Sequence, residues 1–428
     1  MSRRDKMNNL GPKIKKIRKE KKITLSRLAG EDLSASMLSL IENDKATPSI
    51  EMLSLIANKL NIPINELFEE VNMTELRNLF KEVKFLYPRS LRQTEDQKEK
   101  LVFLVKPYID RLPICYESGQ LFLDYGDAIV DLKADLNFGL QYIDKAIYIF
   151  KEIGLVTDWI EANIYKSTLY FLKHDYNVAL QILIQTEDEL SNLLAIPYSS
   201  ITATTHIDLL FMLSQNYFAV GNSDEGYSYL RKVLQYYKEI NIFYRTNEVY
   251  RLAIMQATLD SNKNDLSYFF KKFIEYIRFS EDVNAKLDLY ISMAHYHNNF
   301  SKNIDNAHHY LLKYLNTSTD NGSKVYEYFN LEMGINLYLK GEYKKALTYL
   351  DKIGETPVFI QHPYELARFA QVYTYRALCY EQFGQLSDAI VNAKIAVDKV
   401  KFFSDTPYKK FIKETYNIFV KKINEKKI

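Results

Sequence analysis

The sequence has few of the residues that mark disulfide-rich, low-complexity or membrane proteins. Its 428 residues include two cysteines, Cys115 and Cys379, far apart in the sequence, which fit a reducing cytoplasm better than a disulfide framework. Ten prolines and thirteen glycines leave no long unstructured tract. No apolar run is long enough to cross a bilayer, and none follows the basic N-terminus as in a signal peptide. We therefore expect a folded cytoplasmic protein that does not contact a membrane.

Signatures of cofactor-dependent or metal-dependent enzymes are also missing. The sequence has no Gly-rich phosphate loop and no strand–turn–helix nucleophile site. His295, His297, His308 and His309 cluster within fifteen residues, but no cysteine or carboxylate accompanies them at metal-ligand spacing. We interpret them as surface or groove histidines, and we expect no enzymatic activity, no metal and no cofactor.

The charge is unevenly distributed along the chain. The net charge is +2, yet residues 1–68, which we call the head, hold 13 Lys and Arg against 8 Asp and Glu, and the remainder holds 43 against 46. A basic head on a slightly acidic remainder suits a polyanionic partner at one end. A solvated, frayed terminus would give the same asymmetry, so charge alone does not decide between the two.

The head has the pattern of five short helices. In the first, apolar residues recur on one helical stripe and the lysines lie off it. Thr24 and Ser34 are placed to cap the second and third helices, and Pro48-Ser49 opens the fourth. Pro63 precedes a short fifth helix that ends at Leu67-Phe68.

From about residue 126 to the C-terminus the pattern is one of helix pairs. In the tetratricopeptide repeat, a small residue on the first helix is followed twelve positions later by a small residue on the second, so that the backbones cross closely. Five pairs of positions have this spacing and a sixth misses it by one. They are Ala134/Ala146, Ser167/Ala179, Ser214/Gly226, Gly334/Ala346, Ala377/Ala389 and the longer Ala294/Ala307. A degenerate pair is expected around residues 247–277; an irregular helical bundle is the alternative.

The head resembles the phage-repressor-like helix-turn-helix. The similar segments are Ile23–Ala29, Ser34–Asn43 and Pro48-Ser49. In that family the N-terminal part of the third helix enters the major groove. The resemblance implies an ion pair between Arg18 and Glu42. For contact with double-stranded DNA it implies Ala35, Ser36, Met37, Ser39 and Leu40 at base edges, and Lys45 and Thr47 at phosphates.

Two departures from that family bear on specificity. Leu25 stands where the family often has a Gln that reaches phosphate, and the third helix lacks the Arg, Asn and Gln that usually read bases. Sequence preference must then come from serine hydroxyls, thymine methyl groups or DNA shape. The alternative is a helix-turn-helix that serves as a protein contact or dimerisation module.

Stacked helix pairs expose their first helices on a concave surface that suits an extended peptide. Side-chain amides can hold the peptide backbone, and aromatic residues can receive its side chains. The candidates, mostly counted from the small residues, are Gln215, Phe218, Asn247, His295, Asn298, Asn299, Tyr338, Glu381 and Gln382. For any one of them, an ordinary polar surface position is the alternative.

The whole chain resembles the Gram-positive peptide-pheromone receptors named after Rap, Rgg, NprR, PlcR and PrgX. The turn from Ala29 to Ser34 is one residue shorter than in typical phage repressors, as in PlcR-type receptors, and the length and repeat number are closest to the NprR type. The resemblance implies a homodimer or higher oligomer that binds a short linear peptide and changes its quaternary state or its DNA affinity. Some relatives also bind a response-regulator protein through their repeats.

The sequence therefore predicts an all-α protein with three parts. A helix-turn-helix domain occupies residues 1–68, a helical connector 69–125, and a right-handed tetratricopeptide superhelix for ligand sensing and dimerisation 126–428. The predicted function is that of a quorum-sensing transcription regulator controlled by a peptide. The alternative is a repeat scaffold that sequesters a partner protein such as a response regulator, with a weak or vestigial DNA-binding head.

Overall fold

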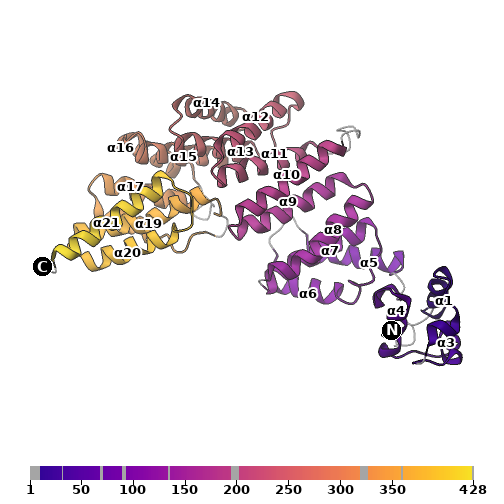
Figure 1. The fold of residues 1–428 in the computed structure, drawn as a ribbon. Coiled ribbons are helices and arrows are strands. Elements are labelled where there is room, and N and C mark those ends of the chain that lie inside the picture. The colour runs from indigo at the N-terminus through magenta and orange to yellow at the C-terminus, as the bar shows by residue number, and fades with distance from the viewer. Residues whose placement is uncertain are drawn as a thin grey trace. The chain divides into compact units, whose positions relative to one another are not determined.

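The computed structural model describes residues 10–30, 32–67, 71–88, 93–133, 135–193, 202–318, 326–357 and 360–426. In these ranges every regular element is a helix (Figure 1), which confirms the all-α class. None of the described helices is long and apolar enough to span a membrane. Contacts divide the chain into two compact units, Met1–Ala162 and Asn163–Ile428. The boundaries predicted after residues 68 and 125 remain predictions.

The described part of the head consists of short helices around an aliphatic core. Its elements are α1 (Leu10–Glu20), α2 (Leu25–Ala29), α3 (Ala35–Glu42), α4 (Ile50–Leu60) and the 3₁₀ helix η2 (Ile64–Leu67). The stripe predicted for α1 is partly buried, with Ile14 fully inside, where it packs among Leu28, Leu38 and Ile56. The five elements match the predicted pattern, and Phe68 lies outside the described residues.

Side-chain caps explain where these short helices begin. The hydroxyls of Thr24, Ser34 and Ser49 accept hydrogen bonds from backbone N–H groups three residues later, at 3.2, 3.1 and 3.3 Å. Each cap satisfies a donor that has no partner within its helix. The predicted caps of the second and third helices are therefore confirmed.

The rest of the first unit contains two longer helices that pack as a pair. The elements are α5 (Met73–Leu86), α6 (Glu95–Val105), α7 (Tyr116–Lys133) and α8 (Leu136–Glu152). The predicted anchor Ala134 lies outside the described residues, and its predicted partner Ala146 is fully buried on α8. A Cβ on Gly126 would lie 2.9 Å from the Gly139 oxygen, so these two glycines make the crossing.

The second unit is a series of antiparallel helix pairs, and α9 (Val156–Leu172) runs across the division between the units. The helices that follow are α10 (Tyr176–Leu193), α11 (Ala203–Ala219), α12 (Ser223–Ile240), α13 (Thr246–Leu259), α14 (Lys263–Ser280), α15 (Val283–Asn299), α16 (Ile304–Thr317), α17 (Tyr326–Leu339), α18 (Tyr343–Leu350), α19 (Pro363–Gln382), α20 (Leu386–Lys399) and α21 (Pro407–Lys426). The degenerate pair expected around residues 247–277 is α13 with α14.

The small residues predicted in this unit lie where the helices of a pair cross. The Ser167 hydroxyl donates to the Ala179 oxygen at 2.9 Å, and the Ser214 hydroxyl donates to the Gly226 oxygen at 2.8 Å. The alanines of the pairs 294/307 and 377/389 are fully buried. A small side chain thus lets two backbones approach within hydrogen-bond reach, as the repeat pattern requires.

The first helices of successive pairs form one continuous row. Helix α11 contacts α13, α13 contacts α15, α15 contacts α17, and α17 contacts α19, while α21 packs on α19 and α20. Residues distant in sequence therefore share the face that these first helices present.

Candidate DNA-binding surface and ligand pocket

Helix α3 separates a core face from an outward face. Leu38 and Ile41 are buried, as predicted, whereas Ser36, Met37 and Leu40 are exposed. Ala35 and Ser39 are half-buried on the same helix, and Lys45 and Thr47 are exposed in the turn between α3 and α4. All seven residues predicted to contact DNA thus keep accessible surface, and their contact with DNA stays a prediction.

Arg18 and Glu42 form the ion pair that the sequence predicts. The Arg18 Nε and Nη2 atoms donate to the two Glu42 carboxylate oxygens at 2.6 and 2.8 Å, and Nη1 donates to the Ile23 oxygen at 3.0 Å. This hydrogen bonding raises the pKa of the Arg18 guanidinium despite partial burial. A bidentate pair fixes the guanidinium and the carboxylate in one relative orientation, so it holds α1 against the end of α3.

The head also carries an exposed cation that the sequence analysis omitted. Arg27 lies on α2 with its side chain exposed. In the helix-turn-helix family this helix crosses the DNA backbone, so an exposed guanidinium there suits a phosphate contact. Residues 25–29 are the short second helix that the pattern had predicted, so position alone could have found Arg27.

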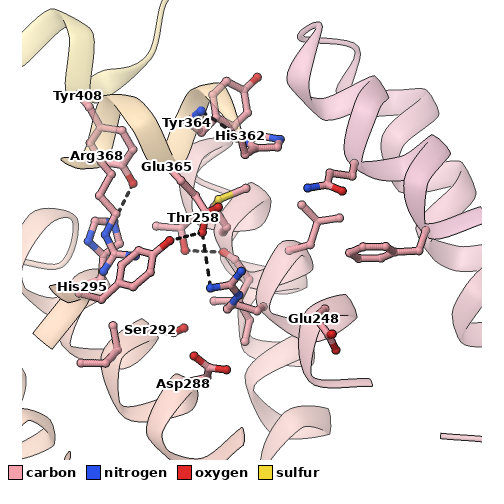
Figure 2. Close-up of a pocket in the computed structure, with 18 of the residues that line it drawn as sticks. Glu248, Thr258, Asp288, Ser292, His295, His362, Tyr364, Glu365, Arg368 and Tyr408 are labelled. Carbon is pink, nitrogen blue, oxygen red and sulfur yellow. Dashed lines mark hydrogen bonds and ion pairs between the residues drawn. The ribbon is translucent and has the colours of Figure 1, made fainter. Parts of the chain in front are cut away.

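A pocket of about 210 Å³ opens on the row of first helices in the second unit (Figure 2). Its walls come from α11, α13, α15, α17 and α19, and Tyr408 of α21 adds to them. Apolar side chains including Phe211, Leu252 and Ile291 alternate with hydroxyl, amide and charged groups. Mixed linings of this kind are typical of sites for small organic ligands.

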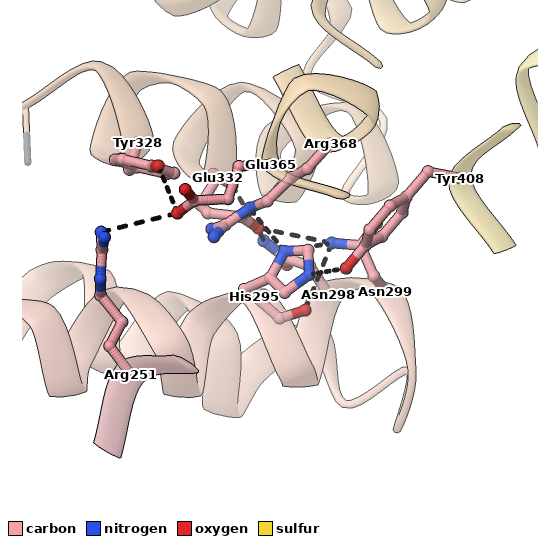
Figure 3. A network of polar contacts seen from close by, with 9 residues as sticks. All are labelled: Arg251, His295, Asn298, Asn299, Tyr328, Glu332, Glu365, Arg368 and Tyr408. Atoms are coloured by element: carbon pink, nitrogen blue, oxygen red, sulfur yellow. Dashed lines mark hydrogen bonds and ion pairs between the residues drawn. The ribbon is translucent and has the colours of Figure 1, made fainter. Parts of the chain in front are cut away.

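One wall contains a closed polar network around Glu332 (Figure 3). The Glu332 carboxylate, fully buried on α17, accepts from Arg368 at 2.7 Å, from His295 Nδ1 at 2.7 Å and from the Asn298 amide at 3.1 Å. Burial raises the pKa of the Glu332 carboxyl, but the hydrogen bonds from His295 and Asn298 and the charge of Arg368 outweigh burial and hold the pKa below its usual range. Glu332 is therefore ionised and fully partnered at neutral pH.

His295 links this network to the C-terminal helix. Burial, together with Arg368, lowers the pKa of His295, so the ring is neutral at neutral pH. Because the Glu332 carboxylate only accepts, we assign the proton to Nδ1, which leaves Nε2 to accept from the Tyr408 hydroxyl at 2.7 Å. One imidazole thus ties α15 to both α17 and α21.

Two further arginines of the pocket lie close to carboxylates. Arg251 Nη1 is 3.6 Å from Glu365, whose carboxylate also accepts from the Tyr328 hydroxyl at 2.7 Å. Arg245 Nε is 2.5 Å from Asp208. Each arginine of the pocket therefore has its own carboxylate.

Asp288 and Glu248 are acidic residues of the lining without an arginine of their own. Asp288 on α15 accepts from the Asn247 amide at 2.7 Å, and burial raises the pKa of its carboxyl. Glu248 on α13 is exposed. Among the described residues, no cation lies within 4.0 Å of either carboxylate.

The structure divides the residues that the sequence proposed for peptide binding. Gln215 and His295 line the pocket, and Asn247 and Asn299 lie just behind it through contacts with Asp288 and Glu332. The other five do not line the pocket. Phe218 and Asn298 are fully buried, and Tyr338 packs against Tyr343 and Tyr375. Glu381 pairs with Lys422, and Gln382 is exposed at the end of α19.

Helix geometry explains this division. Each residue advances about 100° around a helix, so the position four after a small anchor lies only about 40° from it and faces the partner helix. Phe218, four after Ser214, accordingly packs on Gly226. Gln215 and His295 each follow an anchor by one residue and turn toward the pocket.

The charged residues of the pocket were missed at the sequence level. Their signal is a polar stripe at helical spacing on the first helices: Asp288, Ser292 and His295 on α15, and Glu365 and Arg368 on α19. In the described part of the chain, no group of three or more His, Cys, Asp or Glu side chains is arranged to hold a metal ion.

Comparisons with known proteins agree with the division into a head and helical repeats. Residues 14–67 match the helix-turn-helix family. Among solved structures, aspartyl phosphate phosphatase F from Bacillus subtilis is 15% identical, with 94% of this chain and 95% of that chain covered and a TM-score of 0.50. The apo form of the quorum sensor NprR from B. thuringiensis is 14% identical, with coverage of 90% and 97% and a TM-score of 0.48.

Bacillus thuringiensis PlcR, solved in complex with the peptide PapR7 and DNA, is 17% identical, with coverage of 64% and 95% and a TM-score of 0.34. The search of curated proteins found no match. The resemblance suggested by the sequence is therefore confirmed at the level of the fold: a helix-turn-helix domain at residues 14–67 begins a chain that shares the helical-repeat fold of aspartyl phosphate phosphatase F.

Proposed function

We propose that the chain is a transcription regulator whose head binds double-stranded DNA and whose pocket in the second unit binds a short linear peptide. One observation carries the proposal for the head. Helix α3 buries Leu38 and Ile41 while Ser36, Met37 and Leu40 project outward, next to an exposed Lys45. A helix anchored on one side and free on the other is what a major-groove reader requires.

The pocket supports the peptide part of the proposal. It lies on the first helices of the repeats, where an extended segment would run, and it combines the Gln215 amide and the Ser292 hydroxyl with apolar side chains. Amides and hydroxyls suit a peptide backbone, and apolar walls suit its side chains. Such a site has no need of a cofactor.

The proposed mechanism is a population shift in a homodimer. A peptide that binds one arrangement of the repeats more tightly favours that arrangement, and the arrangement sets how two heads are presented to two half-sites. Two heads also compensate for a recognition helix without Arg, Asn or Gln, because half-site spacing adds specificity.

The test is the salt dependence of DNA binding by the full chain. Binding to a labelled duplex, followed by fluorescence anisotropy, should weaken steeply with rising salt because phosphate contacts release counterions. Lys45→Ala should weaken binding to every sequence and reduce the salt slope by about one ion, whereas Ser36→Ala should change the preference among sequences. Lys413→Ala, at an exposed lysine of α21, is the matched control and should bind as the parent does.

The competing proposal is a repeat scaffold that sequesters a partner protein such as a response regulator. It is favoured by the fold shared with aspartyl phosphate phosphatase F over 94% of this chain. Salt-independent DNA binding, together with no effect of either head substitution, would decide for the scaffold.

A further inference from the structure

The pocket walls contain an excess of negative charge. Five carboxylates lie in the walls or directly behind them, and three guanidinium groups face them. The carboxylates belong to Asp208, Glu248, Asp288, Glu332 and Glu365, and the guanidinium groups to Arg245, Arg251 and Arg368. In the ion pairs described above each arginine lies close to one carboxylate, so the carboxylates of Asp288 and Glu248 have no arginine within 4.0 Å.

Neither histidine of the pocket supplies the missing positive charge. Burial lowers the pKa of His362 to about 4, and burial with Arg368 lowers the pKa of His295. Both rings are therefore neutral near pH 7. The one described hydrogen bond to Asp288 comes from the Asn247 amide, which carries no charge.

Asp288 is placed to receive a ligand group. It lies on α15 in the floor of the pocket, one helical turn from Ser292 (Figure 2). Glu248 comes from the neighbouring helix α13, and Phe211 and Leu252 supply apolar surface in the same cavity. Arg251 favours the charged form of Asp288 from beyond 4.0 Å, but burial outweighs it and raises the pKa of the Asp288 carboxyl, so a ligand cation would lower the cost of that charge.

We propose that this pocket takes the cationic end of its ligand, an ammonium or guanidinium group that pairs with Asp288 and is assisted by Glu248. The inference rests on the proposed function, which supplies a peptide as the ligand. The cation is either the peptide's N-terminal ammonium or a Lys or Arg side chain, whose methylene stem would lie along the apolar wall.

The experiment begins with selection of a random heptapeptide library, displayed with free N-termini, on the purified full chain. The most enriched peptide is synthesised in its parent form, with an acetylated N-terminus, and with Lys or Arg replaced by norleucine. We expect one of the two changes to weaken binding to the parent protein by at least about tenfold. Which change does so identifies the source of the cation.

The same peptides are then measured on Asp288→Asn. If Asp288 holds the cation, the parent peptide binds this variant at least about tenfold more weakly, and neutralising the peptide has no further effect. Glu248→Gln, at an exposed position, should show a smaller loss in the same direction. Asp388→Asn, at an exposed aspartate of α20, is the control and should leave affinity unchanged.

A second measurement separates a ligand-binding carboxylate from a structural one. Asp288→Asn removes a charge that burial disfavours and that has no cation within 4.0 Å, while its new amide oxygen still accepts from Asn247, so the melting temperature without peptide should rise or stay the same. A lower melting temperature, or enriched peptides without a cation that bind the variant equally, would overturn the inference and leave the peptide function standing. Recovery of no binding peptide would overturn both.

Discussion

The head and the second unit each bury a carboxylate beneath an arginine, yet the two sites are built differently. Glu42 in the head has one arginine, Arg18, which lies 24 residues away in the sequence. Glu332 in the second unit accepts from four side chains, and through His295 its network reaches Tyr408, 113 residues from that histidine. The first site joins two helices of one small domain, whereas the second joins four helices of successive repeats.

The largest expected effect comes from breaking the more connected site. Glu332→Ala leaves the Arg368 guanidinium and the Asn298 amide buried without their acceptor, so we expect the second unit to lose about 4 kcal/mol of unfolding free energy. This loss can be measured by urea unfolding with tyrosine fluorescence as the signal. The signal does not report on the head, because the first of the 34 tyrosines is Tyr87.

Hydrogen exchange then localises the loss. Protection should fall in α15, α17 and α19 and stay unchanged in the head. The matched control is Asp398→Ala, which removes an exposed partner of Lys394 and should have no measurable effect. Equal losses in the two variants would contradict the role given to the Glu332 network.

Mild acid should lower the stability of the second unit through its histidines and should not act on the head in this way. All seven histidines lie between residues 174 and 362, in the second unit, and the head has none. Burial lowers the pKa of His362 from 6.5 to about 4, so the unfolded chain takes up this proton first as the pH falls. Stability is therefore lost from about pH 6.5 down to about pH 4, by about 3 kcal/mol from this residue.

His362→Asn tests that assignment. The side chain of His362 caps α19 by accepting from the Tyr364 N–H at 3.3 Å, and asparagine can keep that bond without titrating. The urea midpoint of the variant should fall less between pH 7 and pH 4 than that of the parent. The same fall in both proteins would show that this histidine does not set the pH response.

Sequence and structure agree best where the determinants are local. The caps Thr24 and Ser34 and the pair Arg18–Glu42 were predictable, because each depends on spacing within a motif of about sixty residues. The anchors Ser214 and Gly226 were also predictable, since close backbone crossing requires small residues at a fixed interval.

The pocket was harder to predict because its charges come from different repeats. Nothing in the sequence around Asp288 shows that Asn247 is its partner, or that Arg251 lies nearer to Glu365. The side of a helix on which a residue lies also depends on an exact boundary.

The smallest of the three effects concerns the simpler site in the head. Glu42→Ala removes the acceptor of two Arg18 hydrogen bonds, while the bond from Arg18 to the Ile23 oxygen and contact with water remain. We therefore expect a loss of about 2 kcal/mol, less than for Glu332. It should appear as faster hydrogen exchange in α1 and α3 with an unchanged tyrosine signal. Glu20→Ala, at an exposed partner of Lys16 on the same helix, is the control. Equal losses of protection in Glu20→Ala and Glu42→Ala would show that the buried Arg18–Glu42 pair stabilises the head no more than an exposed pair does.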